Sequence, residues 1–364
     1  MKALRVVPLV PDSAELAEID EPRLTDRETL LVEMACVGVC GTDREILAGS
    51  YGEAPQGSPR LVLGHESLGR VLTAPAESLW KAGDLVVGIV RHPDPVPCAN
   101  CAIGEWDMCR NGRYTEHGIK GRHGFCCERY TLDPTHAVRV DASLGELGVL
   151  LEPASVLAKA WEHIERIGSR ALFEPAHVLV TGAGPVGLLG AMMGRQKGLE
   201  VWVLDRDRDG LKSDLVRRLG ARFVADLAEV DDGMLFDVAL ECTGAGSLVL
   251  EVMRRIGPGG VACLTGVSSA SRVIELNADA LGREIVLENG AIFGSVNANR
   301  RHYELAAEAL ARADRAWLEA MITRRVSLES WRDALESGAD IIKNIITGPA
   351  YRDVAEAISA GDRT

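Results

Sequence analysis

The feature that most constrains the fold is a glycine-rich hexad, Gly182-Ala183-Gly184-Pro185-Val186-Gly187, placed between two apolar segments. The segment before it, HVLVTG (177–182), is typical of a buried strand, and the segment after it, GLLGAMMGRQKG (187–198), has apolar residues at helical spacing. G-x-G-x-x-G in this setting is typical of a dinucleotide site, because its glycines permit a tight turn, close approach of a pyrophosphate and close helix packing. An ordinary glycine turn in an α/β sheet is the alternative interpretation.

Residues beyond the hexad predict which dinucleotide is bound. Asp205 ends the next apolar run, 23 residues after Gly182, where a carboxylate accepts hydrogen bonds from the adenosine ribose. This favours NAD over NADP, because a 2′-phosphate would meet a like charge, although Arg206 or Arg208 can reach such a phosphate. Thr243 follows a further apolar run and is expected at the ligand-binding end of the sheet.

The 364 residues predict two domains. Residues 1–155 contain short β-like runs, such as LLVEMACVGVC (30–40), separated by Pro and Gly, which is typical of a β-rich domain of the folded-barrel kind. Residues 156–297 alternate strands with helices, which predicts a doubly wound parallel sheet of the α/β class, a Rossmann domain. Residues 298–364 are expected to return to the first domain, which makes that domain discontinuous.

Composition excludes several classes of function. A formal net charge of −13 argues against a nucleic-acid or anionic-membrane partner, because phosphate binding needs clustered cations. No apolar run reaches the roughly 18–20 residues of a membrane span, and the N-terminus lacks the features of a signal peptide. Nine cysteines, an odd number with three bunched together, are typical of metal chemistry in a reducing compartment. We therefore expect a cytoplasmic protein that acts on a small molecule.

Residues of the first domain predict a catalytic metal site. Cys40 lies in GVCGTD (38–43), and His65 and Glu66 follow about 25 residues later. Thiolate, imidazole and carboxylate ligands with an open position suit a catalytic zinc ion, and Glu152 can supply a further oxygen. Such an ion lowers the pKa of bound water to about 7 in favourable sites, so an alcohol bound there can lose its proton near neutral pH.

Three other cysteines, Cys98, Cys101 and Cys109, form a second candidate metal site. They also suggest an alternative class, a zinc-ribbon binding protein, but such proteins normally show two paired knuckles and a basic surface. This chain has one knuckle and is strongly acidic, which disfavours that alternative. The adjacent Cys126 and Cys127 are expected to be buried thiols.

The chain as a whole resembles the medium-chain, zinc-dependent alcohol and polyol dehydrogenases. The order of motifs carries the resemblance: GxCGTD and GHE in a β-rich domain, then GxGxxG, then a helical tail. Four segments are similar to the glucose dehydrogenases of that superfamily: VRHPDPVPCANCAIGEWDMC (90–109), TEHGIKGRHGF (115–125), GVLLEPASV (148–156) and FGSVNANRRH (293–302). The resemblance implies a GroES-like catalytic domain beside the Rossmann domain, and a homo-oligomer, usually a dimer or tetramer.

The resemblance also implies the roles of the metal-site residues. Cys40, His65 and Glu66 bind or closely attend zinc, and Glu152 is a ligand directly or through water. By the same resemblance, Thr42 passes the alcohol proton toward the nicotinamide ribose.

Three further residues are assigned beside the metal. Glu45 holds the position of a relay histidine in liver-type alcohol dehydrogenases, and its catalytic role is our own inference. Glu116 and Asn297 are similar to the sugar-hydroxyl contacts of glucose dehydrogenases, and Asn297 is also assigned to the cofactor. Fixed carboxylate and amide groups suit a polyol, because a site left with unpaired polar groups rejects analogues.

Two departures from the family pattern matter. Members with a structural zinc show C-x₂-C-x₂-C-x₇-C, but Pro95 stands where the first cysteine belongs. Asp94, His92 or Asp107 is then the candidate fourth ligand, and a metal-free lobe is the alternative. His92 also replaces a second arginine of the sugar-specific relatives, which makes an aldose or polyol a broader prediction than glucose itself.

These observations predict an oxidoreductase that transfers hydride from C1 of an aldose to NAD(P)⁺ and yields an aldonolactone. A dehydrogenase of another polyol, an aminocyclitol or a secondary alcohol on the same scaffold is the alternative. A zinc-free enoyl or quinone reductase is disfavoured, since those relatives lack the set Cys40, His65 and Glu66.

Overall fold

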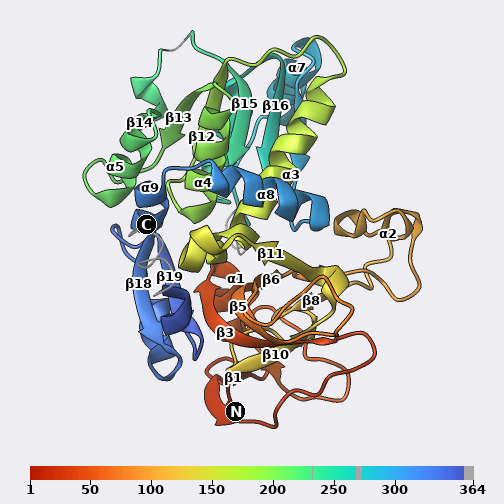
Figure 1. Ribbon diagram of the computed structural model, residues 1–364. Coiled ribbons are helices and arrows are strands. Elements are labelled where there is room, and N and C mark those ends of the chain that lie inside the picture. The colour runs from red at the N-terminus through yellow and green to blue at the C-terminus, as the bar shows by residue number, and fades with distance from the viewer. Residues whose placement is uncertain (232, 268–272, 356–364) are drawn as a thin grey trace. The chain divides into compact units, whose positions relative to one another are not determined.

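The computed structural model describes residues 1–231, 233–267 and 273–355, which belong to two compact units (Figure 1). The first unit contains Met1–Ser155, Asn297–Ala311 and the chain from Ile322 onward, and the second contains Val156–Val296 and Arg312–Met321. In the described part of the chain, no helix is long and apolar enough to span a membrane.

The main sheet of the first unit has seven strands. They are β3 (Leu30–Val39), β5 (Glu66–Thr73), β6 (Leu85–Gly88), β10 (Arg129–Leu132), β11 (Ala137–Val140), β18 (Ile322–Ser327) and β19 (Lys343–Thr347). Their order is β11-β6-β5-β3-β19-β18, and β10 also pairs with β3. The first half of β3 alternates buried and half-buried residues, and every residue from Met34 to Val39 is buried. The apolar run that predicted this strand therefore ends inside the unit, directly before Cys40.

Shorter elements of the first unit surround this sheet. Two three-stranded sheets are formed by β1 (Lys2–Val6), β2 (Glu15–Glu18), β4 (Leu61–Val62), β7 (Arg91–His92), β8 (Thr115–His117) and β9 (Gly121–Arg122). The helices are α1 (Gly41–Leu47), α2 (Ala99–Ala102), α8 (Arg300–Ala311) and the 3₁₀ turns η1 (Trp106–Met108), η2 (Pro134–His136), η3 (Ala142–Leu150) and η5 (Leu328–Leu335). The helix α3 (Leu151–Gly168) begins in the first unit and continues into the second.

The second unit is built on a six-stranded parallel sheet. Its strands are β12 (His177–Thr181), β13 (Glu200–Leu204), β14 (Arg222–Val224), β15 (Phe236–Glu241), β16 (Ile256–Leu264) and β17 (Ala291–Gly294). Its other helices are α4 (Pro185–Gln196), α5 (Leu211–Arg218), η4 (Leu227–Glu229), α6 (Gly246–Arg254), α7 (Ala278–Leu287) and α9 (Arg315–Met321). The order β14-β13-β12-β15-β16-β17 is that of a doubly wound dinucleotide-binding sheet, and it reverses direction between β12 and β15 (Figure 1).

The C-terminal tail divides differently from the predicted segment 298–364. Arg315–Met321 belongs to the second unit, because Trp317 is 2% exposed and its indole Nε1 donates a hydrogen bond to the carbonyl of Leu215 in α5. The strand β18 was also not predicted, since ITRRVS is half-buried and carries two arginines.

Candidate active site

Cys40, His65 and Glu66 come together in the first unit, as the motifs predicted. One ligand atom from each lies within 4.8 Å of the others. Cys40 follows β3 and Glu66 opens β5, and these strands pair so that Gly38 stands opposite Glu66. A Cβ atom at Gly38 would lie 2.0 Å from Glu66 Oε2, so the glycine leaves room for this carboxylate.

The local sequence GVCGTD fixes the orientation of Cys40. Cys40 is the N-cap of α1, and its Sγ accepts a hydrogen bond from the Thr42 backbone N–H at 3.4 Å. The Cys40 N–H donates to Asp43 Oδ2 at 2.9 Å, which completes a capping box. The thiol therefore lies at the positive end of the helix with little freedom to turn away.

Asp43 also faces the imidazole of His65. The distance from Asp43 Oδ1 to His65 Nδ1 is 3.4 Å, and neither atom has a hydrogen-bond partner of good geometry among the described residues. Burial disfavours a charged imidazole, but the negative charges of Asp43 and Cys40 raise the pKa of His65 well above its usual range. A buried site that favours positive charge beside a thiol and an imidazole fits a bound cation.

A buried lysine, which the sequence analysis did not identify, pairs with Glu66. Lys343 in β19 is 2% exposed, and its Nζ lies 2.7 Å from Glu66 Oε1 and 2.5 Å from Oε2. Burial disfavours the ammonium, yet Glu66 raises the pKa of Lys343 overall. The segment IIKNIIT could have indicated this ion pair, because a single lysine in an apolar, buried strand requires a buried anion as its partner.

Glu152 supplies a further carboxyl group near this cluster. It lies in the first turn of α3 and is 8% exposed. Burial raises the pKa of Glu152 to about 7, with His65 and Lys343 lowering it and Glu66 raising it. Glu152 is not among the residues whose ligand atoms lie within 4.8 Å of one another. The sulfur, imidazole and carboxylate of Cys40, His65 and Glu66 are a donor set that fits a catalytic zinc ion.

Thr42 and Glu45 both lie on α1, the helix that Cys40 caps. Tyr51 follows this helix, and burial raises its pKa, with the charges of Glu116 and Glu45 adding to the shift.

Two polar side chains, those of Arg91 and Asn297, hold the carboxylate of Glu116. Its Oε1 accepts hydrogen bonds from Arg91 Nε at 3.0 Å, from Arg91 Nη2 at 2.9 Å and from Asn297 Nδ2 at 2.6 Å. Glu116 is 3% exposed. The structure thus brings together Glu116 and Asn297, both of which were predicted as sugar-hydroxyl contacts, and adds Arg91, which was not predicted.

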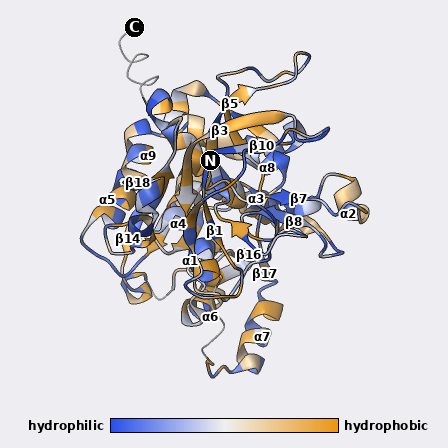
Figure 2. Ribbon diagram, turned by 90° about the horizontal axis from the view of Figure 1, so that it is seen from below, coloured by the Kyte–Doolittle hydropathy of each residue, from blue (hydrophilic) through white to orange (hydrophobic). Residues whose placement is uncertain are grey.

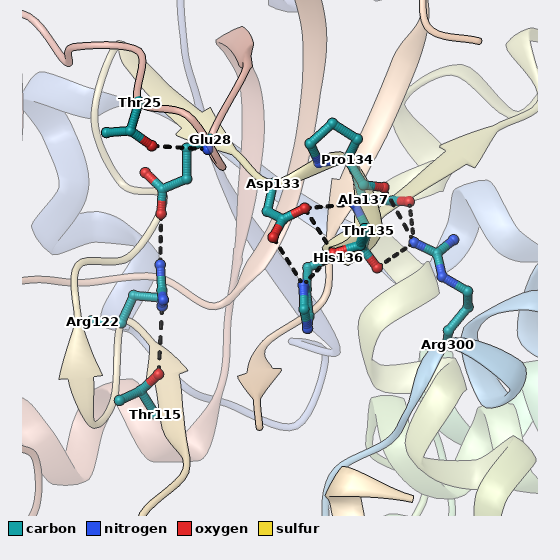
Figure 3. Close-up of polar contacts among 10 residues, drawn as sticks. All are labelled: Thr25, Glu28, Thr115, Arg122, Asp133, Pro134, Thr135, His136, Ala137 and Arg300. Atoms are coloured by element: carbon teal, nitrogen blue, oxygen red, sulfur yellow. Dashed lines mark hydrogen bonds and ion pairs between the residues drawn. The ribbon is translucent and has the colours of Figure 1, made fainter. Parts of the chain in front are cut away.

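Three histidines pack together on the face of the three-stranded sheet β7-β8-β9 that is opposite to Glu116. His92 stacks on His136 with ring centroids 3.9 Å apart and meets His117 edge-on at 4.9 Å. Burial lowers the pKa of His92 well below its usual range, and His117 and His136 add to this effect. Figure 3 shows His136 beside Asp133, on a turn whose carbonyls accept hydrogen bonds from Arg300.

The three-cysteine lobe has no fourth ligand among the described residues. Cys98, Cys101 and Cys109 place their sulfurs within 4.8 Å of one another, and no carboxylate or imidazole of the described chain joins them. The three predicted fourth ligands are engaged elsewhere: His92 in the ring stack, Asp94 with Val96, Asn111 and Arg113, and Asp107 with Asn299. In the described chain, none of the three candidates offers a donor atom within 4.8 Å of all three sulfurs.

In the second unit, the glycine hexad joins β12 to α4 as predicted. Gly182 has a φ of +88°, and a Cβ at Gly187 would lie 1.8 Å from the Gly182 carbonyl oxygen. Pro185 and Val186 open α4, with Gly184 as its N-cap. The free N–H groups of this helix start and its positive dipole end suit a pyrophosphate.

Asp205 lies at the end of β13 and contacts this turn. Its Oδ2 accepts a hydrogen bond from the Ala183 N–H at 2.7 Å. Arg206 is exposed, whereas the guanidinium of Arg208 pairs with Glu229. Of the two arginines, Arg206 is therefore the one that the structure leaves available beside Asp205.

Thr243 lies in a turn held by a buried carboxylate that the sequence analysis missed. Glu241, at the end of β15, is fully buried and accepts hydrogen bonds from the N–H and hydroxyl of Thr243 and from the Gly244 N–H. Thr181 also donates to it at 3.1 Å. Glu241 therefore joins the ends of β12 and β15, where the strand order reverses.

Comparison with known proteins assigns the chain. The family models "Alcohol dehydrogenase GroES-like domain" and "Glucose dehydrogenase C-terminus" match residues 26–142 and 145–347. The chain is 37% identical to the glucose 1-dehydrogenase of Methanocella arvoryzae and 39% identical to that of Thermoproteus tenax, each over 95% of this chain and 99% of that enzyme. The solved glucose dehydrogenase of Haloferax mediterranei, in complex with NADP, Zn and gluconolactone, is 33% identical, with a TM-score of 0.88 over 96% of this chain and 99% of that chain.

Fold, site and comparisons define an NAD(P)-dependent medium-chain dehydrogenase, with a GroES-like domain and a Rossmann domain as predicted. Within that class, the chain belongs to the glucose dehydrogenase family.

Proposed function

We propose that this enzyme oxidises an aldose at C1, with D-glucose as the expected substrate, and releases an aldonolactone. The observation that carries the proposal is the buried Glu116, held by Arg91 and Asn297, in the same unit as the cluster of Cys40, His65 and Glu66. The names of the curated relatives, glucose 1-dehydrogenases, support the same substrate.

The proposed reaction removes a proton from the anomeric hydroxyl and a hydride from C1. Cys40, His65 and a carboxylate would hold a zinc ion that would acidify the anomeric hydroxyl, and a bound nicotinamide would accept the hydride. Asp43 orients the imidazole of His65, and Lys343 neutralises the charge of Glu66. Thr42 and Glu45 remain predicted proton carriers on α1.

Asp205 supports a preference for NAD over NADP. Its carboxylate is fixed to the Ala183 N–H at the glycine turn, where a ribose hydroxyl is favoured over a 2′-phosphate. The Haloferax enzyme was solved with NADP, so the exposed Arg206 is the residue to compare. We expect kcat/KM to be higher with NAD⁺, and Asp205→Ala to lower it with NAD⁺ more than with NADP⁺.

A matrix of sugars and cofactors tests the proposal. Purified, zinc-replete enzyme is assayed with D-glucose, D-galactose and D-xylose and with NAD⁺ or NADP⁺, and Cys40→Ala serves as the inactive control. We expect aldose-dependent formation of reduced cofactor. Turnover of secondary alcohols or threonine without any aldose turnover would overturn the sugar assignment and favour the other polyol or alcohol function.

We also propose a homo-oligomer in the cytoplasm. The helix α7 contains no buried residue and exposes Val286 and Leu287, at 75% and 60%, and Figure 2 shows hydrophobic residues along it. Exposed apolar surface of this kind supports contact with a second copy. All nine cysteines are free thiols, which supports a reducing compartment. Light scattering of the purified enzyme at several concentrations tests the oligomer, and a monomer throughout would contradict it.

A further inference from the structure

We propose that Arg91 is a positioning residue for sugar recognition: by occupying one oxygen of Glu116, it directs the other oxygen to a hydroxyl of the aldose. This inference rests on the proposed function, since it states how the proposed sugar site is built.

Arg91 is fixed at three of its donor groups. It lies in β7, directly opposite Glu116 in the antiparallel pair β7–β8. Its Nε and Nη2 both donate to Glu116 Oε1, and its Nη1 donates to the carbonyl oxygen of Asp107 at 3.0 Å. A planar guanidinium bonded on two edges cannot rotate without breaking one set of bonds.

The two carboxylate oxygens of Glu116 differ in the number of hydrogen bonds that they accept. Oε1 receives three hydrogen bonds, two from Arg91 and one from Asn297. Oε2 receives none from the residues that the structure describes, although the side chain as a whole is almost fully buried. A charged acceptor with one occupied and one open oxygen is prepared to accept a hydrogen bond from a hydroxyl donor.

An aromatic ring covers the guanidinium. The centroid of the Tyr114 ring lies 3.7 Å from Arg91 Cζ and 4.3 Å from Lys120 Nζ. This contact limits motion of Arg91 out of the sheet plane. A lysine at position 91 would keep the charge but could make neither the paired bonds to Oε1 nor the planar contact with Tyr114.

The expected consequence concerns binding of the sugar. Without Arg91, Glu116 can turn, and a hydrogen bond between its charged oxygen and the substrate weakens. Hydrogen bonds to charged groups contribute about 1.5–3 kcal/mol, so we expect KM for D-glucose to rise about 10- to 100-fold in Arg91→Met. We expect Arg91→Lys to restore little of this loss, and the dissociation constant for NADH, measured by fluorescence, to stay within about twofold.

The test is a double-mutant cycle on zinc-replete enzyme, with Arg91→Met, Glu116→Gln and the double variant. If Arg91 acts through Glu116, Arg91→Met has no further effect on KM in the Glu116→Gln background. Additive effects of the two substitutions would overturn the inference. The double variant also leaves no buried carboxylate unpaired, so it keeps the comparison available if Arg91→Met alone folds poorly.

Arg122→Met is the matched control. Arg122 lies in β9 of the same small sheet; its Nη1 donates to Glu28 at 2.6 Å and its Nε to the Thr115 hydroxyl at 3.5 Å (Figure 3). We expect KM for D-glucose in this variant to stay within about twofold, and an equal rise would assign the Arg91 effect to the sheet alone. If Glu116→Gln leaves KM unchanged, the assigned sugar contact itself is wrong; if only Arg91→Met leaves KM unchanged, the inference alone fails.

Discussion

The first unit contains two clusters with sulfur ligands, and they differ in how they are built. The cluster of Cys40, His65 and Glu66 joins segments far apart in the chain, and its lysine partner lies 277 positions from Glu66. The cluster of Cys98, Cys101 and Cys109 lies within twelve consecutive residues, from the N-cap of α2 to the C-cap of η1. Both bring three donor atoms within 4.8 Å, so proximity of ligands alone does not distinguish them.

The surroundings of the two clusters do distinguish them. The first is buried against Asp43, Lys343 and Glu152, whose charges act directly on its ligands. In the second, backbone N–H groups, that of Arg110 first, lower the pKa of Cys98 to about 6. The charges around the first cluster therefore come from distant parts of the fold, whereas the surroundings of the second come from one local loop.

The largest expected effect follows from removing Cys40. Cys40→Ser should lower kcat/KM about 1000-fold or more, because metal polarisation contributes several kcal/mol to catalysis. Zinc per chain, measured by atomic emission, should fall in the same variant. Activity close to that of the natural enzyme would break the assignment of this cluster as the catalytic one.

Removing Lys343 should have the next largest effect, on stability. Lys343→Met leaves Glu66 buried and unpaired, and we expect the free energy of unfolding to fall by about 3–5 kcal/mol in urea titrations. Adding Glu66→Gln should recover most of that loss, because no charge is then buried alone. A loss below about 1 kcal/mol in Lys343→Met would show that this pair does not support the cluster.

Asp43→Asn should affect zinc affinity more than folding. Asparagine can still accept the hydrogen bond from the Cys40 N–H, but it removes the negative charge beside His65. We expect zinc affinity to fall about 10- to 100-fold in competition with a chelator, as for other groups that orient metal-binding histidines. Unchanged affinity would assign Asp43 to helix capping alone.

The same contrast explains which parts of the molecule the sequence predicts. The hexad at 182–187 and the run 30–40 predict their turn and strand because local periodicity and glycine geometry determine them. Arg91 and Lys343 were missed because their partners, Glu116 and Glu66, are brought to them by strand pairing that no local pattern encodes.

The candidate fourth ligands of the three-cysteine lobe lie outside its group of close donor atoms in the described chain. His92, Asp94 and Asp107 are close in sequence to the cysteines, and sequence distance made them candidates. Each is instead held by a ring stack or hydrogen bonds of its own. Sequence spacing therefore identifies candidate donors near the cysteines in the chain, while long-range packing decides which of them face the site.

The smallest expected effect comes from the second cluster. Cys109→Ser should leave kcat/KM within about twofold, since the three-cysteine lobe contributes no residue to the proposed chemistry. The free energy of unfolding should fall by about 1 kcal/mol or less, because a three-sulfur set lacks the fourth ligand of a closed structural zinc site. A loss of several kcal/mol, together with release of one zinc per chain, would instead show that a metal ion stabilises this lobe, because binding energy at a structural zinc site is folding energy. The two clusters would then differ in chemistry but not in their importance for the fold.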